Sequence, residues 1–319
     1  MNPKVSLLIP VFKSEKYIAE CLQTVFEQTY NNIEIIIVND ATPDDSMYIV
    51  NKLSNYYSEK KFDIKIIHHD SNKGIAATRN TLLNNAKGDY VFFIDSDDFI
   101  VANAIELLVK NASNTNADIV RCSYYNYSNG TNTIIHHVPF IDKNDLLKQH
   151  ISAWDSIEAM WQLFIRRNLF EKHQLRFADG INAAEDYLIT LQLFYYADII
   201  TEIATPLYHY RADNEQSLTH TNKVAFRESM YKAMDEAINF LKENGVFDIF
   251  QEEVLTRTFL CKQSYLLNKT HRDINIYLNT HPECNSYYKN FNYSQTQNLL
   301  FKLAESRNTL LLKLFTLFL

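Results

Sequence analysis

The chain has 319 residues, and its 46% hydrophobic content is enough to form a core, which excludes a wholly disordered protein. The formal net charge is −7 and the isoelectric point is about 5.8, so the concentrated basic face of a nucleic-acid-binding protein is not expected. The four cysteines are far apart and form no CxxC pair, which excludes a disulfide framework and a cysteine zinc site.

Strand-like and helix-like patterns alternate over the first hundred residues. Apolar runs typical of buried strands occupy Val5–Ile9, Ile33–Val38, Ile64–Ile67 and Tyr90–Ile94. Helical spacing predicts helices over about 18–26 with Ser14 as N-cap, over 44–57, and over 76–87 with Gly88 closing the last. Because strands separated by helices of this length form βαβ units, the pattern predicts a parallel sheet.

The predicted strands end in polar or conformationally restricted residues at Pro10, at Asp40, at 68–70 (His-His-Asp) and at 95–98 (Asp-Ser-Asp-Asp). The carboxyl ends of parallel strands meet at one edge of the sheet, where open α/β sheets bind ligands. Three carboxylates within 95–98 repel one another unless water or a cation neutralises them. This turn therefore predicts a divalent metal that holds a phosphate, with a solvated acidic turn as the alternative. The histidine pairs 68–69 and 136–137 lack metal-ligand spacing and are interpreted as structural.

The second half of the chain is less regular. A helix is predicted at 104–111, a strand at 119–125 and a hairpin turn at Asn129-Gly130. A helix over 188–194 has Glu185 and Asp186 in its first turn, where the helix dipole alone would favour carboxylates. Two strands are predicted at 199–203 and 207–210, and only helices from about Thr221 onward.

Six blocks of sequence carry a family resemblance. They are Val5–Phe12 with 17–18, 21–22 and 28–29; Glu34–Asp40; Asn72–Asn80; Phe93–Asp98; Trp161 with Glu185-Asp186; and Tyr208–Arg211 with 217–219. In this order and spacing, over about residues 4–219, the chain resembles the family 2 glycosyltransferases of the GT-A fold.

The resemblance implies an α/β fold of the GT-A type, a Rossmann-like and mostly parallel central sheet flanked by helices, with an all-helical C-terminal extension. We expect a glycosyltransferase domain at 1–220 and the extension at 221–319. Within the first domain, 1–100 would be the nucleotide-binding half and 101–220 the half that carries the acceptor site and the catalytic base.

The resemblance also implies contacts with a nucleotide-sugar donor. Pro10, Val11 and Phe12 would form the loop under the nucleotide base, with the ring of Phe12 stacking on the base. Asp40 would accept the N–H of the base's imide, which favours uridine and a UDP-sugar. Arg79 would reach the base or the diphosphate, and Arg211 and Ser217 would lie near the diphosphate. The nucleotide-sugar-binding residues expected in total are Pro10, Val11, Phe12, Asp40, Gly74, Arg79, Asp95 and Ser96.

A metal and a catalytic base complete the implied site. Asp97 is the expected direct ligand of Mn²⁺ or Mg²⁺, hard ions that prefer oxygen, and Asp95 would reach the ribose or a metal-bound water. Asp186 is the expected catalytic base of an inverting transfer, taking the proton of the acceptor hydroxyl. Glu185 remains the alternative base, or a group that binds the acceptor or the metal. His209 and His220 are interpreted as ordinary hydrogen-bonding groups, with a place in the metal shell as the alternative.

The chain departs from the family's commonest residues at several positions: Phe12 for Tyr, Lys13 for Asn, Asn39 for Asp and Ala41-Thr42 for Gly-Ser. None removes an essential charge, but they weaken the assignment of one particular nucleotide. A sugar nucleotidyltransferase would need a Gly-rich loop with Arg after the first strand, where 10–14 reads Pro-Val-Phe-Lys-Ser. A dehydrogenase would need a GxGxxG motif after a strand, and this sequence has none. A non-catalytic glycan-binding or scaffold subunit on a transferase fold is the remaining alternative.

The expected function is therefore transfer of a sugar to a glycan or lipid-linked glycan in surface-polysaccharide synthesis, by a cytoplasmic enzyme. Thr309–Leu319 is apolar but far shorter than a membrane span. It could pack on its own helices, pair with a partner subunit, or lie in a membrane interface, which would place the enzyme on the cytoplasmic face of the inner membrane.

Overall fold

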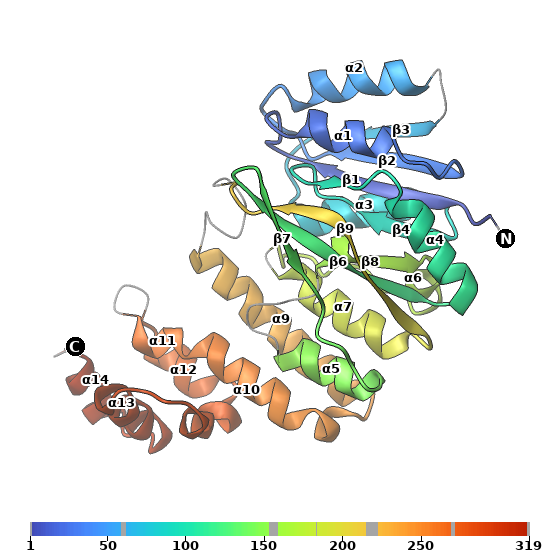
Figure 1. Ribbon diagram of the computed structural model, residues 1–319. Helices are drawn as coiled ribbons and strands as arrows, with labels where there is room; N and C mark the ends of the chain where they lie inside the picture. The colour runs from blue at the N-terminus through green and yellow to red at the C-terminus, as the bar shows by residue number, and fades with distance from the viewer. Residues whose placement is uncertain are drawn as a thin grey trace.

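The computed structural model describes residues 2–58, 62–152, 159–182, 184–214, 223–268 and 272–317. Its strands are β1 (Val5–Val11), β2 (Ile33–Asn39), β3 (Asp63–His68), β4 (Tyr90–Phe93), β5 (Phe99–Ile100), β6 (Ile119–Ser128), β7 (Thr131–Ile135), β8 (Leu163–Arg166) and β9 (Ile200–Arg211). Within the described ranges they form one sheet in the order β3-β2-β1-β4-β8-β6-β9-β5, with β7 paired to β6 (Figure 1).

The first half of the sheet is parallel, as the sequence predicts. Val5 of β1 lies opposite Ile33 of β2 on one side and Tyr90 of β4 on the other, and β3 pairs parallel with β2. Strands β1, β2 and β3 are each followed by a helix that returns the chain to the same end of the sheet, so the four parallel strands end at one edge. The α/β fold class is thereby confirmed.

The second half of the sheet is mixed. Strand β8 is antiparallel to β4 and β6, while β9 runs parallel to β6 and antiparallel to β5. The hairpin predicted at Asn129-Gly130 is confirmed between β6 and β7, where both residues have positive φ angles. The two strands predicted at 199–203 and 207–210 are one continuous strand, β9, because its pairing with β6 continues past an irregularity between Cys122 and Tyr124.

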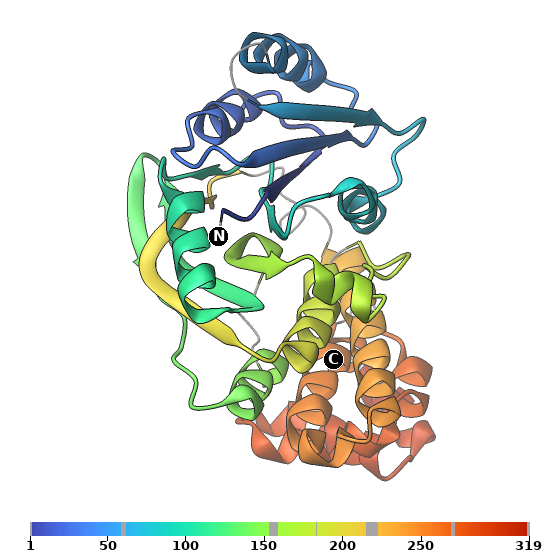
Figure 2. The same cartoon turned by 90° about the vertical axis from the view of Figure 1, so that its right-hand side faces the viewer.

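Helices cover both faces of the sheet (Figures 1 and 2). Alternate β1 residues divide between two cores: Leu7 packs with the first group of helices and Leu8 with the second. The first group is α1 (Ile18–Phe26), α2 (Ser46–Ser58) and α4 (Ala104–Thr115). The second group includes α3 (Ile75–Asn85), α5 (Lys143–Ser152), α6 (Asn168–Lys172) and α7 (Glu185–Tyr196).

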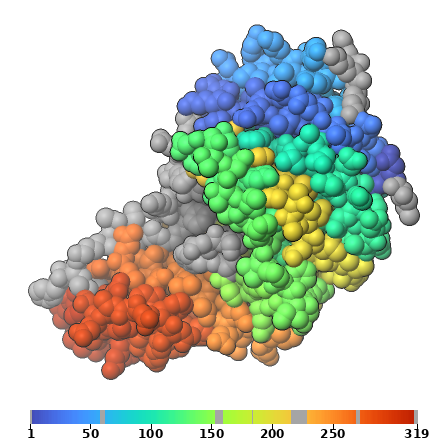
Figure 3. Space-filling view, in the orientation of Figure 1, coloured from blue at the N-terminus to red at the C-terminus, as the bar shows by residue number. Residues whose placement is uncertain are grey.

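The C-terminal helices extend the second core. They are α9 (Lys223–Glu243), α10 (Gln251–Lys262), α11 (Ser264–Leu267), α12 (Ile274–Asn279), α13 (Gln295–Glu305) and α14 (Thr309–Leu317), with 3₁₀ turns at Phe247–Ile249 and Pro282–Asn290. Met234 of α9 and Phe259 of α10 belong to the same buried cluster as Leu191 of α7. Figure 3 shows these helices as a lobe beside the sheet. Only helices occur in the described part of the chain after β9, and the domain boundary at residue 220 stays a prediction.

Two predicted helix ends are wrong, and both residues serve contacts between segments instead. Helix α1 begins at Ile18, and the hydroxyl of Ser14 lies 3.4 Å from that of Ser46 rather than capping the helix. Helix α3 ends at Asn85, so Gly88 is not its C-terminal cap. A Cβ at Gly88 would lie 2.6 Å from the backbone nitrogen of Ser6, so the close approach to β1 requires glycine.

The described part of the apolar tail is helix α14. Leu312 is fully buried, whereas Leu310, Leu311 and Leu314 are 70%, 48% and 46% exposed. Core packing thus accounts for Leu312 and, in part, for Phe315, which packs against the second core. None of the helices in the described ranges is both long and apolar enough to cross a membrane.

Candidate active site

The acidic turn after β4 is anchored by its last carboxylate. Asp98 is fully buried and accepts hydrogen bonds from the Tyr208 hydroxyl (2.8 Å) and the Arg211 backbone N–H (2.7 Å), both on β9. The Tyr208 hydroxyl oxygen also accepts from the Asp95 backbone N–H at 3.0 Å. The turn is therefore tied to β9 through Asp98, and the carboxylates of Asp95 and Asp97 remain for other contacts.

Asp95 and Asp97 form a compact acidic pair. Burial raises the pKa of Asp97, and the charge of Asp95 raises it further. Asn214, just beyond β9, donates a hydrogen bond to the Asp97 carboxylate at 2.8 Å and partly offsets these effects. A cation at this pair would favour the charged form of Asp97.

Arg79 joins this turn to the predicted catalytic carboxylates. Its side chain is 3% exposed, and one terminal nitrogen donates to Asp95 at 3.1 Å. The other terminal nitrogen donates to Glu185 at 2.6 Å and to Asp186. Residues separated by about a hundred positions in sequence thus meet on a single guanidinium. The sequence-based role of Arg79 at the base or diphosphate stays a prediction, and its observed partners are the three carboxylates.

Glu185 and Asp186 occupy the first turn of α7, as predicted. Burial raises the pKa of both carboxyls, and the charge of Asp186 adds to the effect on Glu185. The Arg79 guanidinium acts in the opposite direction and favours both charged forms. The Asp186 side chain is 16% exposed against 9% for Glu185, and its second oxygen accepts from the Met160 backbone N–H at 3.3 Å. Asp186 is therefore the more accessible of the two.

Asp40 holds the loop that precedes α3. Its carboxylate is buried and accepts from the backbone N–H groups of Lys73 (2.8 Å) and Gly74 (2.9 Å) and contacts the His69 ring nitrogen Nδ1 at 2.7 Å. A carboxylate has about four acceptor positions, so these contacts leave little capacity for a nucleobase. The contact between Asp40 and the imide stays a prediction, whereas the structural role of His69 follows from this hydrogen bond.

Gly74 is required by the same loop. Its φ angle is +85°, and a Cβ there would overlap the side chain of Asn182, in the segment that leads to α7. Glycine thus allows the loop of α3 and the approach to α7 to lie against each other. The nucleotide contact expected of Gly74 remains a prediction, as does that of the buried Ser96.

Of the three residues predicted to form the loop under the base, only Phe12 is exposed. Strand β1 continues through Val11, so the prediction that Pro10 and Val11 lie in a loop is wrong: they are buried and pair with β2. Phe12 is 40% exposed at the carboxyl end of β1, with the Lys13 ammonium 5.2 Å from its ring centroid, so part of the ring is accessible for stacking.

Arg211 lies behind the acidic turn. Its guanidinium donates to the Asp97 carbonyl at 2.8 Å and to Glu20 at 2.5 Å, and three aromatic rings surround it. These contacts fix the turn, so the expected role of Arg211 at the diphosphate has no support here. Ser217 and His220 lie outside the described residues. His209 is stacked against Phe99, contacts Asn132 and has its pKa lowered by burial to about 4.

The donor set suits a hard cation held jointly with a substrate. Across the described residues, no three Asp, Glu, His or Cys side chains come together as a metal cage. Asp95 and Asp97 instead offer two carboxylates at one turn, and burial of Asp97 disfavours its charge without a counter-ion. Mg²⁺ is usually held by one or two carboxylates plus phosphates, so these residues fit such an ion.

Sequence reasoning missed three residues that support the site. Tyr208 on β9 and Asn214 just beyond it fix the turn, and Asp98 is its anchor rather than a free carboxylate. The block at 208–211 was a visible signal for Tyr208. Asn214 carried no signal, because it lies 117 positions from Asp97 in the sequence and meets it only in the folded chain.

Known proteins that are similar to this chain in sequence are described as glycosyltransferases. The chain is 31% identical over 271 residues to the uncharacterized glycosyltransferase EpsJ of Bacillus subtilis, covering 82% of this chain and 76% of the relative. It is also 31% identical over 274 residues to the putative glycosyltransferase EpsH of the same species, covering 84% and 78%.

A solved structure shares the fold over nearly the whole chain. It is that of Staphylococcus aureus TarS 1–349 in complex with UDP-GlcNAc, with a TM-score of 0.71 and 21% identity, covering 98% of this chain and 90% of that one. The model of the family described as "Glycosyl transferase family 2" matches residues 6–176. The fold, the site and these matches show that the chain is a glycosyltransferase and belongs to glycosyltransferase family 2.

Proposed function

We propose that the chain transfers a sugar from a UDP-sugar to a hydroxyl of a glycan or lipid-linked glycan, with inversion at the anomeric carbon. The observation that carries this proposal is the Arg79 contact that brings Asp95, of the acidic turn, next to Glu185 and Asp186. A turn suited to the leaving diphosphate and a carboxylate suited to the acceptor proton thus share one site.

The donor would lie over the carboxyl ends of the parallel strands. Phe12 offers an exposed ring for the base, and the acidic turn lies at the end of β4, adjacent to β1 in the sheet. TarS, which shares this fold, has been solved in complex with UDP-GlcNAc, and this supports a uridine diphosphate as the nucleotide part of the donor.

Mn²⁺ or Mg²⁺ would be held by Asp97, with Asp95 beside it and the diphosphate supplying further oxygens. Such an ion offsets the negative charge that builds on the departing diphosphate. Asn214 and Arg211 keep the turn in place for this binding, through their contacts with the Asp97 side chain and carbonyl.

Asp186 would take the proton of the acceptor hydroxyl as the new glycosidic bond forms. A base must be charged to accept a proton, and burial opposes that charge. The Arg79 guanidinium counters burial and favours the charged form of Asp186. Glu185 is the more enclosed carboxylate, so we assign it to holding Arg79 in place.

Thermal unfolding with Mn²⁺ and a panel of nucleotide sugars tests the proposal. The correct donor at about 100 times its Kd should stabilise the fold by about 2.7 kcal/mol, and UDP should be released with time. UDP release also separates an enzyme from a non-catalytic glycan-binding subunit. Absence of stabilisation by every nucleotide sugar, together with absence of UDP release, would refute the transferase assignment.

Membrane contact through α14 is a separate proposal. Its three exposed leucines, Leu310, Leu311 and Leu314, support an interfacial position, where a lipid-linked acceptor would also lie. Flotation with liposomes should recover the full chain and lose the chain truncated before Thr309. Equal flotation of both chains would remove the membrane role of α14.

A further inference from the structure

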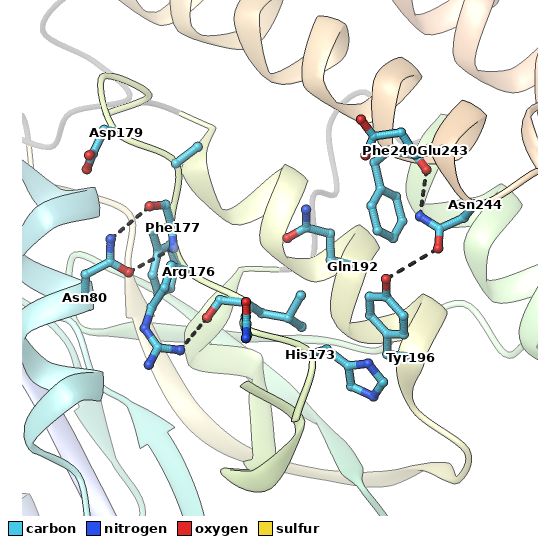
Figure 4. A pocket seen from close by; sticks show the side chains of 13 residues that line it. Asn80, His173, Arg176, Phe177, Asp179, Gln192, Tyr196, Phe240, Glu243 and Asn244 are labelled. Carbon is cyan, nitrogen blue, oxygen red and sulfur yellow. Dashed lines mark hydrogen bonds between the residues drawn. The ribbon is translucent and has the colours of Figure 1, made fainter. Parts of the chain in front are cut away.

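A polar pocket lies apart from the acidic turn, between the loop 173–179, helix α7 and the end of helix α9 (Figure 4). Its volume is about 560 Å³. Helix α7 contributes Gln192 and Tyr196, and the end of α9 contributes Phe240, Glu243 and Asn244. The site described above does not use this pocket, which combines the sheet-containing part of the chain with its C-terminal helices.

The polar groups of the pocket are largely available to a ligand. Within the described part of the chain, the side chains of Gln174, Gln192, Asp179 and Glu243 have no hydrogen-bond partner. They supply amide donors and carbonyl and carboxylate acceptors, which match the hydroxyl groups of a sugar. The rings of Tyr196 and Phe240, 5.9 Å apart, add the apolar surface that the C–H faces of a sugar ring require.

The charges of the pocket argue against an anionic ligand. Asp179 and Glu243 are both acidic. Arg176 is the only lysine or arginine among the described residues that line the pocket. Its guanidinium already donates to Asn84 at 3.1 Å and to the Leu175 carbonyl at 2.8 Å. A phosphate or nucleotide would need unengaged cationic groups, so a neutral polyhydroxyl ligand fits better.

The pocket shares structural elements with the candidate base. Helix α7 begins with Glu185 and Asp186, and its rise of 1.5 Å per residue places Gln192 about 9 Å and Tyr196 about 15 Å from Asp186 along the axis. The loop wall is rigidly held, since Asn80 makes two hydrogen bonds with the Phe177 backbone, at 2.8 and 2.9 Å.

The same wall faces the site at its other side. The Phe177 ring lies 5.7 Å from the Arg79 guanidinium, while residues 176–178 line the pocket (Figure 4). A ligand in the pocket would therefore be too far from Asp186 to react, and it would be joined to a reacting hydroxyl only through further sugars of the same chain.

We propose that this pocket binds a neutral oligosaccharide and holds the non-reacting part of the acceptor glycan. The acceptor role rests on the proposed sugar transfer, whereas saccharide binding does not require the donor. The pocket thereby gives the enzyme a second contact with its acceptor, away from the reacting hydroxyl.

Binding of neutral oligosaccharides to the full chain, without donor or metal, tests the proposal. An array of neutral glucose, galactose and N-acetylglucosamine oligosaccharides would identify the best probe, and titration calorimetry would give its affinity. The pocket variants are Gln192→Leu and Glu243→Gln. The matched control is Glu236→Gln, which makes the same charge change on an exposed face of α9 outside the pocket.

Each pocket variant should weaken the probe at least about threefold, the effect of losing one hydrogen bond, and the control should bind as the unmodified chain does. UDP affinity and thermal unfolding should be unchanged in all three variants. The proposal is overturned if no neutral oligosaccharide binds, or if both pocket variants bind the probe with unchanged affinity. Failure of UDP to bind would instead count against the proposed transferase function.

Discussion

Replacement of Arg79 by Gln tests whether the guanidinium favours the ionised form of the base. The guanidinium is buried and is shared among Asp95, Glu185 and Asp186, so one positive charge faces three carboxylates. Burial raises the pKa of Asp186 and Arg79 lowers it. Removal of the guanidinium leaves the first effect without the second, so the pKa of the base must rise.

The size of the change follows from the contacts. An opposite charge within about 4–6 Å lowers a carboxylate pKa by about 1–3 units, and one unit corresponds to about 1.36 kcal/mol. Arg79→Gln should therefore raise the pKa of the base by about 1–3 units. Below that pKa the ionised fraction falls tenfold for each pH unit, so activity is lost at low pH and partly regained at high pH.

The assay is the pH dependence of kcat/KM for UDP release from the donor. The acid limb of the profile should move upward by about 1–3 pH units in Arg79→Gln and much less in Arg79→Lys, which keeps the charge. Circular dichroism must first establish folding, because breaking a buried ion pair can cost about 3–5 kcal/mol. If Arg79 instead bound the nucleotide alone, UDP affinity would fall and the acid limb would stay in place, which would refute the reasoning.

Three further substitutions test separate parts of the account. Asp97→Asn should reduce the rate of UDP release in Mn²⁺ by about 100-fold or more, since several kcal/mol of charge stabilisation are lost. The unfolding free energy of this variant at neutral pH should not fall, because burial already disfavours the charged form of Asp97. Phe12→Ala should weaken UDP binding by about 1–3 kcal/mol in a calorimetric titration, and Phe12→Tyr should not. Gly74→Ala should lower the unfolding free energy in urea by about 1–3 kcal/mol, because Gly74 has a positive φ and a Cβ there would overlap Asn182. Adding Asn182→Ala to Gly74→Ala should restore only the part of this loss that is due to the overlap.

Local patterns predicted the first half of the fold well. The run Ile33–Val38 is apolar at every residue except Glu34 and is buried throughout, because both faces of a parallel strand are covered; such near-continuous apolar runs are visible in sequence. The ends of elements were less accessible. Ser14 and Gly88 look like helix caps locally, but their contacts are with Ser46 and Ser6, which lie distant in the chain.

The sequence predicted which residues belong to the site better than it predicted the contacts between them. The motif residues Asp95, Asp97 and Asp186 were identified from their blocks, and the structure brings Asp95 and Asp186 to the same guanidinium. That Arg79 would contact the carboxylates could not be read from sequence, since the contacts span 106 and 107 positions. Hydrogen bonds of this kind depend on how α3 and α7 pack, which no local pattern encodes.

Asp186→Asn, compared with Glu185→Gln, tests the central claim most directly. The measurement is kcat for UDP release with the acceptor present, alongside the Kd of UDP in the same buffer. We predict that Asp186→Asn lowers kcat by about 10²–10⁴-fold with an unchanged Kd for UDP, while Glu185→Gln retains more activity. Full turnover by Asp186→Asn would contradict the assignment of this carboxylate as the base.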